Sequence, residues 1–332
     1  MSTIKAWTYS HEGYPKALKS STLPTPQAPG ATEIHVRVKA AAINPVDTQL
    51  MNIPIWPYLP TMLAPAEKGV AEDFAGVVSA AGPESGFKVG DEVFGISMQI
   101  TAGTLQEVAV VDTKSAVVVP KPSDWSWEQA AALPLVWLTA RTTIAAVEPY
   151  VKNNRVAVLG GSSSTGMYAV YLAKQRGWTV TASCSNRNAD FVRSMGATEI
   201  IDYTSSNVAD NVKTFRPDAI IDCVGGTDCL GLAPRYVTIV GDKTSRMVMG
   251  GAAIYLWNPQ MLVRSWLGRF GLSYAYDCVN LELKRPFLEE TLRLPQDKII
   301  IDSTYNFDQV REAFERLNTG RARGKVVVKV SS

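Results

Sequence analysis

The sequence predicts an α/β protein with two domains: a mostly β N-terminal domain and a doubly wound parallel sheet that follows it. Three observations support this prediction. The chain has 332 residues, more than one hydrophobic core usually holds. Short β-type runs broken by Gly, Pro, Asp and Asn fill the part before about residue 120. From about residue 155, continuous apolar runs alternate with helical patterns, which is typical of a parallel sheet covered on both faces.

The β-rich part contains five expected strands, and the pattern then changes to helix. Residues 123–147 are rich in alanine and leucine, and Ser126 followed by Gln129 fits the capping box that opens a helix. The expected strands are EIHVRVKAAAI (33–43), GVVSAAG (76–82), DEVFG (91–95), LQEVAVVD (105–112) and SAVVVP (115–120).

The second half shows the regular alternation of strands and helices. The expected strands are RVAVL (155–159), TVTASC (179–184), EIIDY (199–203), DAIIDCV (218–224) and RYVTIV (235–240), and the first three precede helical patterns at 167–177, 188–196 and 207–215. After about residue 280, the patterns at 281–294 and 307–317 predict helices, and 324–330 predicts a final strand.

Composition excludes several classes of function. The net charge is +2 and no long basic run is present, so we expect no nucleic-acid partner. The start lacks the apolar segment of a secretory signal, and no run of eighteen uncharged apolar residues occurs, so we expect a cytoplasmic protein with no membrane partner. The only histidines are His11 and His35. The cysteines show no paired spacing that indicates disulfides or a zinc knuckle: Cys184, Cys223, Cys229 and Cys278.

The stretch GGSSSTG at 160–166 follows an apolar run and precedes a helical pattern. A dinucleotide-binding turn needs glycine at the bend, a small residue beside the pyrophosphate, and glycine where helix meets strand. Ser163 stands near the middle position, and helix amides would hold the phosphates. Taken alone, the stretch fits a serine-rich loop without a ligand equally well. The candidate cofactor-binding residues are Gly161, Ser162, Ser163, Ser164, Thr165 and Gly166.

The end of the next expected strand favours NADPH over NADH. An NAD-selective site usually carries an acid there, to bind the ribose 2′-hydroxyl. Here the stretch ASCSNRN (182–188) has no acid, and its donors and positive charge suit a 2′-phosphate. A polar loop with a solvated arginine is the alternative. The candidates are Ser183, Ser185, Asn186 and Arg187.

Several segments resemble, in family order, the medium-chain dehydrogenase/reductase superfamily. They are AAAINPVDTQL (40–50), DFAGVV (73–78), FKVGDEVFG (87–95), WEQAAALPLVWLTA (127–140), VAVLGGSSSTGMYAVYLAK (156–174), FVRSMGATEIIDY (191–203) and GRARGKVVVKV (320–330). Within the superfamily they are similar to the zinc-free quinone oxidoreductase and enoyl reductase branch, and the SSSTG loop is similar to fungal stand-alone enoyl reductases. The resemblance implies a GroES-like, mostly β catalytic domain at 1–127 with 280–332, and a Rossmann NADPH-binding domain at 128–279.

The same resemblance implies that the chain holds no zinc. The zinc alcohol dehydrogenases bind the metal with two cysteines and a histidine. In this chain, Asn44 stands at the position of the first cysteine, the histidine position falls near Glu72, and the second cysteine position falls near Leu135. Alcohol oxidation gains most from a metal Lewis acid. Reduction of an enone or quinone gives a weakly basic anion that hydrogen-bond donors can stabilise. We therefore expect metal-free hydride transfer from NADPH to a conjugated C=C bond or a quinone.

The resemblance also assigns individual residues. It places Asn44, Pro45, Val46 and Asp47 beside the nicotinamide, Thr139 near the carboxamide, Tyr203 beside the 2′-phosphate, Cys223, Val224 and Gly225 at a ligand-binding strand end, and Gly250, Gly251, Gly324 and Lys325 over the nicotinamide. The catalytic candidates are Asn44, Asp47, Thr139 and Tyr58. Each has a structural alternative, such as an Asn-Pro turn or a packed tyrosine.

The proton donor, the substrate and the oligomeric state stay open. Gln49 stands where quinone oxidoreductases commonly carry a tyrosine, and Tyr58 or solvent could supply the proton. An enone, an enoyl thioester or a quinone are the candidate substrates. One alternative is a trans-acting enoyl reductase that takes a substrate bound to a carrier protein. A different class is a non-catalytic structural protein that binds a dinucleotide. The chain is a monomer, or a homodimer formed through the strand at 272–276.

Overall fold

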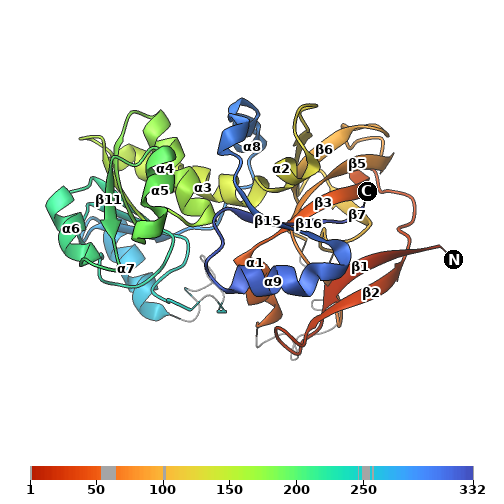
Figure 1. Ribbon diagram of the computed structural model, residues 1–332, viewed down its shortest axis with the longest axis horizontal. Coiled ribbons are helices and arrows are strands. Elements are labelled where there is room, and N and C mark those ends of the chain that lie inside the picture. Colours follow the sequence, from red (N-terminus) through yellow and green to blue (C-terminus); the bar gives the residue numbers. More distant parts are fainter. Residues whose placement is uncertain are drawn as a thin grey trace. The chain divides into compact units, whose positions relative to one another are not determined.

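The computed structural model describes residues 2–53, 65–99, 102–245, 247–248, 255 and 258–331 (Figure 1). The chain forms two compact units. Unit 1 comprises Met1–Leu135, Arg246–Met249 and Leu283–Ser332, so it contains both ends of the chain; unit 2 comprises Val136–Ser245 and Gly250–Glu282. The predicted fold class is confirmed: unit 1 is a mostly β, GroES-like domain and unit 2 is a doubly wound Rossmann domain.

Unit 1 contains a seven-stranded sheet in the order β15-β16-β3-β5-β6-β8, with β7 also paired to β3, and a three-stranded sheet in the order β2-β1-β4. In the larger sheet only β15 and β16 run parallel. The strands are β1 (Thr3–Tyr9), β2 (Leu18–Pro24), β3 (Glu33–Ile43), β4 (Lys68–Gly69), β5 (Asp73–Ala81), β6 (Glu92–Ile96), β7 (Val108–Asp112), β8 (Val117–Pro120), β15 (Ile301–Asn306) and β16 (Lys325–Lys329).

Short helices pack around these sheets. They are α1 (Pro45–Met51), α2 (Trp127–Ala131), α8 (Arg285–Glu289) and α9 (Val310–Asn318). In α9, Val310, Ala313, Phe314 and Leu317 are buried at the helical spacing of three and four residues, and they join the core around β3. The capping box is confirmed: Gln129 N donates to Ser126 Oγ at 3.1 Å.

The helix predicted over 281–294 is wrong in its first turn. α8 begins at Arg285, and the segment continues as a 3₁₀ helix at Glu290–Arg293. The physical reason is a tertiary contact. The amide of Glu282 donates to Thr142 Oγ1 at 2.9 Å, so the residues before Leu283 are held in unit 2 instead of starting the helix.

Unit 2 is a six-stranded sheet in the order β11-β10-β9-β12-β13-β14, and every neighbouring pair is parallel. Because the chain order reverses between β9 and β12, the carboxyl ends of these two strands form the switch point where such sheets bind ligands. The strands are β9 (Arg155–Leu159), β10 (Thr179–Cys184), β11 (Glu199–Asp202), β12 (Ala219–Asp222), β13 (Arg235–Thr238) and β14 (Ala275–Cys278); the helices are α3 (Pro134–Val147), α4 (Ser164–Gln175), α5 (Ala189–Ser194), α6 (Val208–Phe215) and α7 (Pro259–Arg269).

Within the described residues, one helical run, Trp127–Tyr150, is long and apolar enough to cross a membrane by length and composition alone. It includes α2 and α3. Of its most apolar window, 78% is buried inside the fold, which is typical of a core helix.

Candidate active site

The glycine turn of unit 2 is tied to the end of the neighbouring strand. After β9 the chain turns at Gly160, whose φ is +81°. The amide of Gly160 donates to Ser183 Oγ at 2.9 Å, and the amide of Gly161 donates to Ser183 O at 2.9 Å. Ser183 is itself buried. This serine was expected at the 2′-phosphate, and the structure shows its hydroxyl bound to the backbone of the turn.

Gly166 and Ser163 fix the start of α4. A Cβ at Gly166 would lie 2.2 Å from Gly160 O, so only glycine lets the helix approach the turn this closely. Ser163 is the N-cap of α4, and its Oγ accepts from Gly166 N at 3.0 Å. The serine in the middle of the turn therefore caps the helix whose first amides are the candidate phosphate site.

The four residues expected at the 2′-phosphate have different exposures. Ser183 and Ser185 are buried, whereas Asn186 and Arg187 are exposed in the 3₁₀ turn Asn186–Asn188. Tyr203, which follows β11 at the same edge of the sheet, is 57% exposed. Asn186, Arg187 and Tyr203 are therefore accessible to a ligand from solvent.

Asp202 is an acid at this edge that the sequence analysis did not consider. Its carboxylate accepts from Thr204 Oγ1 at 2.7 Å, from Thr204 N at 3.0 Å and from Ser205 Oγ at 3.0 Å. These hydrogen bonds, with a smaller one from the backbone of Asn186, lower the pKa of Asp202. The carboxylate is thus occupied by its own loop.

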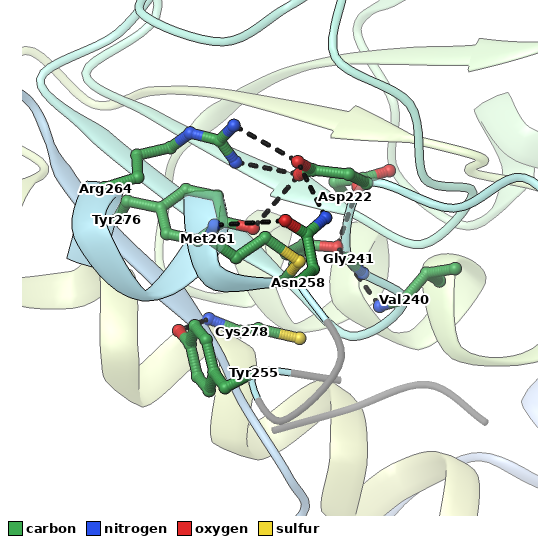
Figure 2. Close-up of polar contacts among 11 residues, drawn as sticks. Asp222, Val240, Gly241, Tyr255, Asn258, Met261, Arg264, Tyr276 and Cys278 are labelled. Carbon is green, nitrogen blue, oxygen red and sulfur yellow. Dashed lines mark hydrogen bonds and ion pairs between the residues drawn. The ribbon is translucent and has the colours of Figure 1, made fainter. Parts of the chain in front are cut away.

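A second acid that sequence reasoning missed, Asp222, organises the end of β12 (Figure 2). Its Oδ1 accepts from the amides of Val224 and Gly225, both at 2.9 Å, and its Oδ2 accepts from Thr238 Oγ1 at 2.8 Å. The side chain is fully buried, and this burial raises its pKa. Burial also raises the pKa of the Cys223 thiol, so this strand end offers no reactive thiolate.

The other sequence-predicted residues of unit 2 are placed only in part. Thr139 lies in α3 and is almost fully buried. Val224 is exposed, and Gly225 has a φ of +84°. Three predicted residues lie outside the described residues: Tyr58, Gly250 and Gly251.

In unit 1, polar side chains gather in the core beside α1. Lys325 is only 2% exposed, and its Nζ donates to Asp73 Oδ2 at 2.8 Å and also to Asn44 Oδ1. Asn44 Nδ2 donates to Asp73 Oδ2 at 3.0 Å, and the amide of Leu135 donates to Asp73 Oδ1 at 2.8 Å. We call Asn44, Asp47, Glu72, Asp73 and Lys325 the buried ionic cluster. Gly324, whose φ is +97°, directly precedes Lys325.

Asp47 of this cluster binds backbone amides with both oxygens. Its Oδ2 accepts from Asn44 N at 2.6 Å, which completes a capping box on α1, and its Oδ1 accepts from Ala71 N at 2.8 Å. Burial raises the pKa of Asp47 to about 7, against these two hydrogen bonds. Pro45 occupies the first turn of α1 and is exposed, while Val46 packs half-buried on the core.

Glu72 is the least satisfied member of the cluster. Its side chain is buried, and its Oε2 has no hydrogen-bond partner among the described residues. Burial and the neighbouring Asp47 and Asp73 raise its pKa well above the usual value. The protonated form of Glu72 is therefore favoured relative to a solvent-exposed glutamate, beside a paired lysine and aspartate. From the sequence, Glu72 stands out only as a residue near a ligand position of the zinc alcohol dehydrogenases.

Comparison with known proteins identifies the family. Residues 30–123 match the alcohol dehydrogenase GroES-like domain family, and residues 195–328 match the family described as zinc-binding dehydrogenase. The chain is 31% identical to the trans-enoyl reductase pgmF of Aspergillus terreus, over 99% of this chain and 97% of the relative. The chain belongs to the medium-chain dehydrogenase/reductase superfamily.

Other members of this superfamily agree with the predicted branch. Human mitochondrial NAD(P)H oxidoreductase RTN4IP1 is 31% identical, over 98% of this chain and 89% of the relative. The quinone oxidoreductase of Coxiella burnetii superposes with a TM-score of 0.81 at 25% identity, covering 99% of this chain and 100% of the other. The Escherichia coli quinone oxidoreductase in complex with NADPH shares the fold, with a TM-score of 0.74 at 21% identity over 98% and 99% of the two chains. The protein is an oxidoreductase of the quinone oxidoreductase and enoyl reductase branch.

Proposed function

We propose that this protein is an NADPH-dependent, metal-free reductase that delivers hydride to a conjugated C=C bond or to a quinone. The preference for NADPH over NADH rests on the residues at the end of β10. Exposed Asn186 and Arg187 follow this strand, and no acid stands between Ser183 and Arg187. A 2′-phosphate needs such donors, whereas a carboxylate would repel it.

The residues of unit 2 fit a dinucleotide. The missing Cβ of Gly166 and the cap by Ser163 leave the first turn of α4 directly against the strand ends. Its amides would bind the pyrophosphate, and Asn186, Arg187 and Tyr203 would bind the 2′-phosphate. NADPH, when bound, supplies the hydride. The protein binds and orients it.

The donor set of the buried ionic cluster does not fit zinc. Zinc sites in proteins use cysteine, histidine and carboxylate ligands, and this cluster holds an amide and an ammonium beside its acids. The carboxylate of Asp73 is already bound by Lys325 at 2.8 Å, and a divalent cation there would face a fixed positive charge. Across the described ranges, no group of three or more His, Cys, Asp and Glu residues is arranged to hold a metal ion. We therefore propose chemistry in which hydrogen-bond donors stabilise the enolate or phenolate that forms.

The variant Arg187→Ala tests the cofactor proposal. We expect the dissociation constant of NADPH to rise roughly ten- to hundredfold, because a hydrogen bond to a charged group is lost, and that of NADH to change little. Fluorescence titration with each cofactor measures both. Arg193→Ala, which removes an exposed arginine paired with Asp190 at 3.1 Å, is the matched control. Wild-type protein that binds NADH as tightly as NADPH would contradict the proposal.

A second candidate is a trans-acting enoyl reductase, favoured by the similarity to a relative that is named a trans-enoyl reductase. NADPH absorbance followed with quinones, enones and enoyl thioesters separates the candidates. We expect turnover of at least one class. An enoyl group turned over on a carrier protein, and not as a free thioester, would support the carrier-dependent version. Cofactor binding without turnover of any of them would support the non-catalytic alternative.

A further inference from the structure

Helix α7 and the turn after it carry an exposed apolar surface in unit 2. Met261 is the only buried residue of α7. Trp266 is 63% exposed, Phe270 67% and Leu272 73%, and the rings of Trp266 and Phe270 lie 5.8 Å apart. We call the exposed apolar side chains the α7 patch: Leu262, Val263, Trp266, Leu267, Phe270 and Leu272. Contiguous apolar surface of this kind marks an interaction site.

The opposite side of α7 is anchored firmly. Arg264 makes two hydrogen bonds to Asp242, at 2.8 and 3.1 Å, and its guanidinium lies 4.8 Å from the ring centre of Tyr276 (Figure 2). Asn258 caps the helix by accepting from Met261 N at 3.4 Å. Rotation of α7 to bury the patch would break these contacts. The exposure is therefore built into the fold.

The segment that carries the α7 patch lacks acidic residues. From Lys243 to Tyr276 the sequence contains no Asp or Glu. Among the described basic residues of this segment, Lys243 has a buried Nζ, Arg264 is paired with Asp242, and Arg269 is exposed. The flanking acids are neutralised, because Asp242 pairs with Arg264 and Asp277 pairs with Arg235 at 2.6 Å. Arg269 is exposed and forms no ion pair with any residue that the structure describes. Beside its apolar groups, the described part of this surface therefore presents the uncompensated positive charge of Arg269.

Two features argue against a second copy of the chain as the occupant. The amide of Ala275 donates to Pro234 O, next to β13, and that of Val279 donates to Thr238 O at the end of β13. The amide of Cys278 therefore points to the outer edge of β14, where it already donates to the hydroxyl of Tyr255 at 2.7 Å. Strand pairing across this edge is thus hindered. A second copy would also bring its own Arg269 to the contact, and residues 243–276 contain no acid that could pair with it.

We propose that the α7 patch docks the protein on the surface of a membrane that contains anionic lipids. Trp266, Phe270 and Leu272 would enter the boundary between headgroups and acyl chains, and Arg269 would contact lipid phosphate. An apolar face with aromatic side chains and an arginine, without acids, is the chemistry that such a surface recognises. Docking of this kind needs no spanning segment. The inference replaces the expectation of no membrane partner, and it does not depend on the proposed function.

Co-sedimentation with vesicles tests the proposal. Vesicles of phosphatidylcholine mixed with phosphatidylserine should bind the protein, vesicles of phosphatidylcholine alone should bind it more weakly, and added salt should weaken binding to the mixture. The double variant Trp266→Ser/Phe270→Ser should bind at least tenfold more weakly. Arg269→Gln should weaken binding to the mixed vesicles about fivefold, because one basic residue near an anionic surface contributes about 1 kcal/mol. Val89→Ser, at an exposed apolar residue of unit 1, is the control and should bind like the wild type.

Three results would overturn the proposal. One is failure of the wild type to bind the mixed vesicles. Another is equal binding by the wild type and the double variant. The third is a light-scattering mass that falls from dimer to monomer in the double variant, which would make the patch a contact between copies. If the double variant does not fold, as judged from its melting temperature, Arg269→Gln and the salt dependence decide.

Discussion

The two units hold their candidate site residues by opposite means. In unit 1, the buried ionic cluster places ionisable side chains in the core, and Lys325 and Asp73 satisfy each other. In unit 2, the turn from Gly160 to Gly166 is held by backbone amides and by glycines with no room for a side-chain atom. Its nearby charged group, Arg187, is exposed.

This difference determines what each region tolerates. A buried charge is stable only while its partner is present, so unit 1 should respond strongly to changes of charge and pH. The turn of unit 2 is held by backbone hydrogen bonds and close packing instead of by a buried charge. Its stability should therefore be sensitive to substitutions that add side-chain atoms. The four predictions below test this contrast, from the largest expected effect to the smallest.

Lys325→Met should have the largest effect, because it leaves the buried Asp73 carboxylate without its cation. The free energy of unfolding, measured by urea denaturation, should fall by about 3–5 kcal/mol. Lys329→Met is the control in the same strand. Lys329 pairs with Glu128 at 3.2 Å, but its side chain is half exposed, so its loss should cost less than about 1 kcal/mol. Similar losses in both variants would show that burial of the charge does not govern unit 1.

Gly166→Ala should destabilise unit 2 by about 1–3 kcal/mol, since the new Cβ meets Gly160 O at 2.2 Å and the helix must move away. NADPH should bind at least tenfold more weakly, as measured by titration. Gly177→Ala, at the other end of α4, is the matched control. Its φ is +76°, so an alanine there is strained and lowers stability, but no atom lies within 4 Å of the new Cβ. The affinity for NADPH should therefore be unchanged. An unchanged NADPH affinity in Gly166→Ala would contradict the close-packing argument.

Glu72→Gln should change the pH dependence of stability. The folded pKa of Glu72 is raised above the unfolded value of 4.5, so above that pH the folded state holds a proton that the unfolded state has lost. Wild-type stability therefore falls as pH rises, by at most about 1.4 kcal/mol per pH unit for this group. The free energy of unfolding of the variant should therefore increase relative to that of the wild type as pH rises from 4.5.

Urea denaturation over a pH series measures this difference. Asp47, whose pKa burial raises to about 7, contributes a slope of the same sign that remains in the variant. Parallel curves for the wild type and Glu72→Gln would mean that Glu72 is ionised in the folded protein.

Ser183→Ala should have the smallest effect. It removes the oxygen that accepts from the Gly160 amide at 2.9 Å, at a cost of about 1 kcal/mol in the free energy of unfolding. Ser194→Ala, which removes an exposed hydroxyl bound to Phe191 O, should cost less. The melting temperatures of the two variants give the comparison. Equal decreases in melting temperature would show that the hydrogen bond between Ser183 and the turn stabilises the fold no more than the exposed one made by Ser194.

Local sequence signals predicted unit 2 better than the cluster of unit 1. The stretch GGSSSTG is contiguous, and its position between a strand and a helix is visible in the chain. The pair of Asp73 and Lys325 joins residues 252 positions apart, and nothing near either residue indicates the other. Asp222 could have been predicted from the sequence, because an acid inside the apolar run DAIIDCV is costly to bury unless hydrogen bonds satisfy it.

The strand order and the exposed face of α7 were also beyond local patterns. No helix was predicted over 259–269, and the buried Met261 and the ion pair of Arg264 with Asp242, which mark the inward side of α7, are visible only in the structure. The placement of residues 281–284 was wrong for the same reason. A contact with Thr142, far back in the sequence, decides it.

The position of β16 has a consequence for synthesis of the chain. This strand lies between β15 and β3 inside the larger sheet of unit 1, yet it occupies residues 325–329 of 332. A ribosome adding roughly 5–20 residues per second needs about 13–50 s to pass from Asp73 to Lys325, 252 residues later. Throughout that interval the nascent carboxylate lacks its cation and β3 lacks a neighbour. All of unit 2 is synthesised before β16, so unit 2 can fold before the larger sheet of unit 1 is complete.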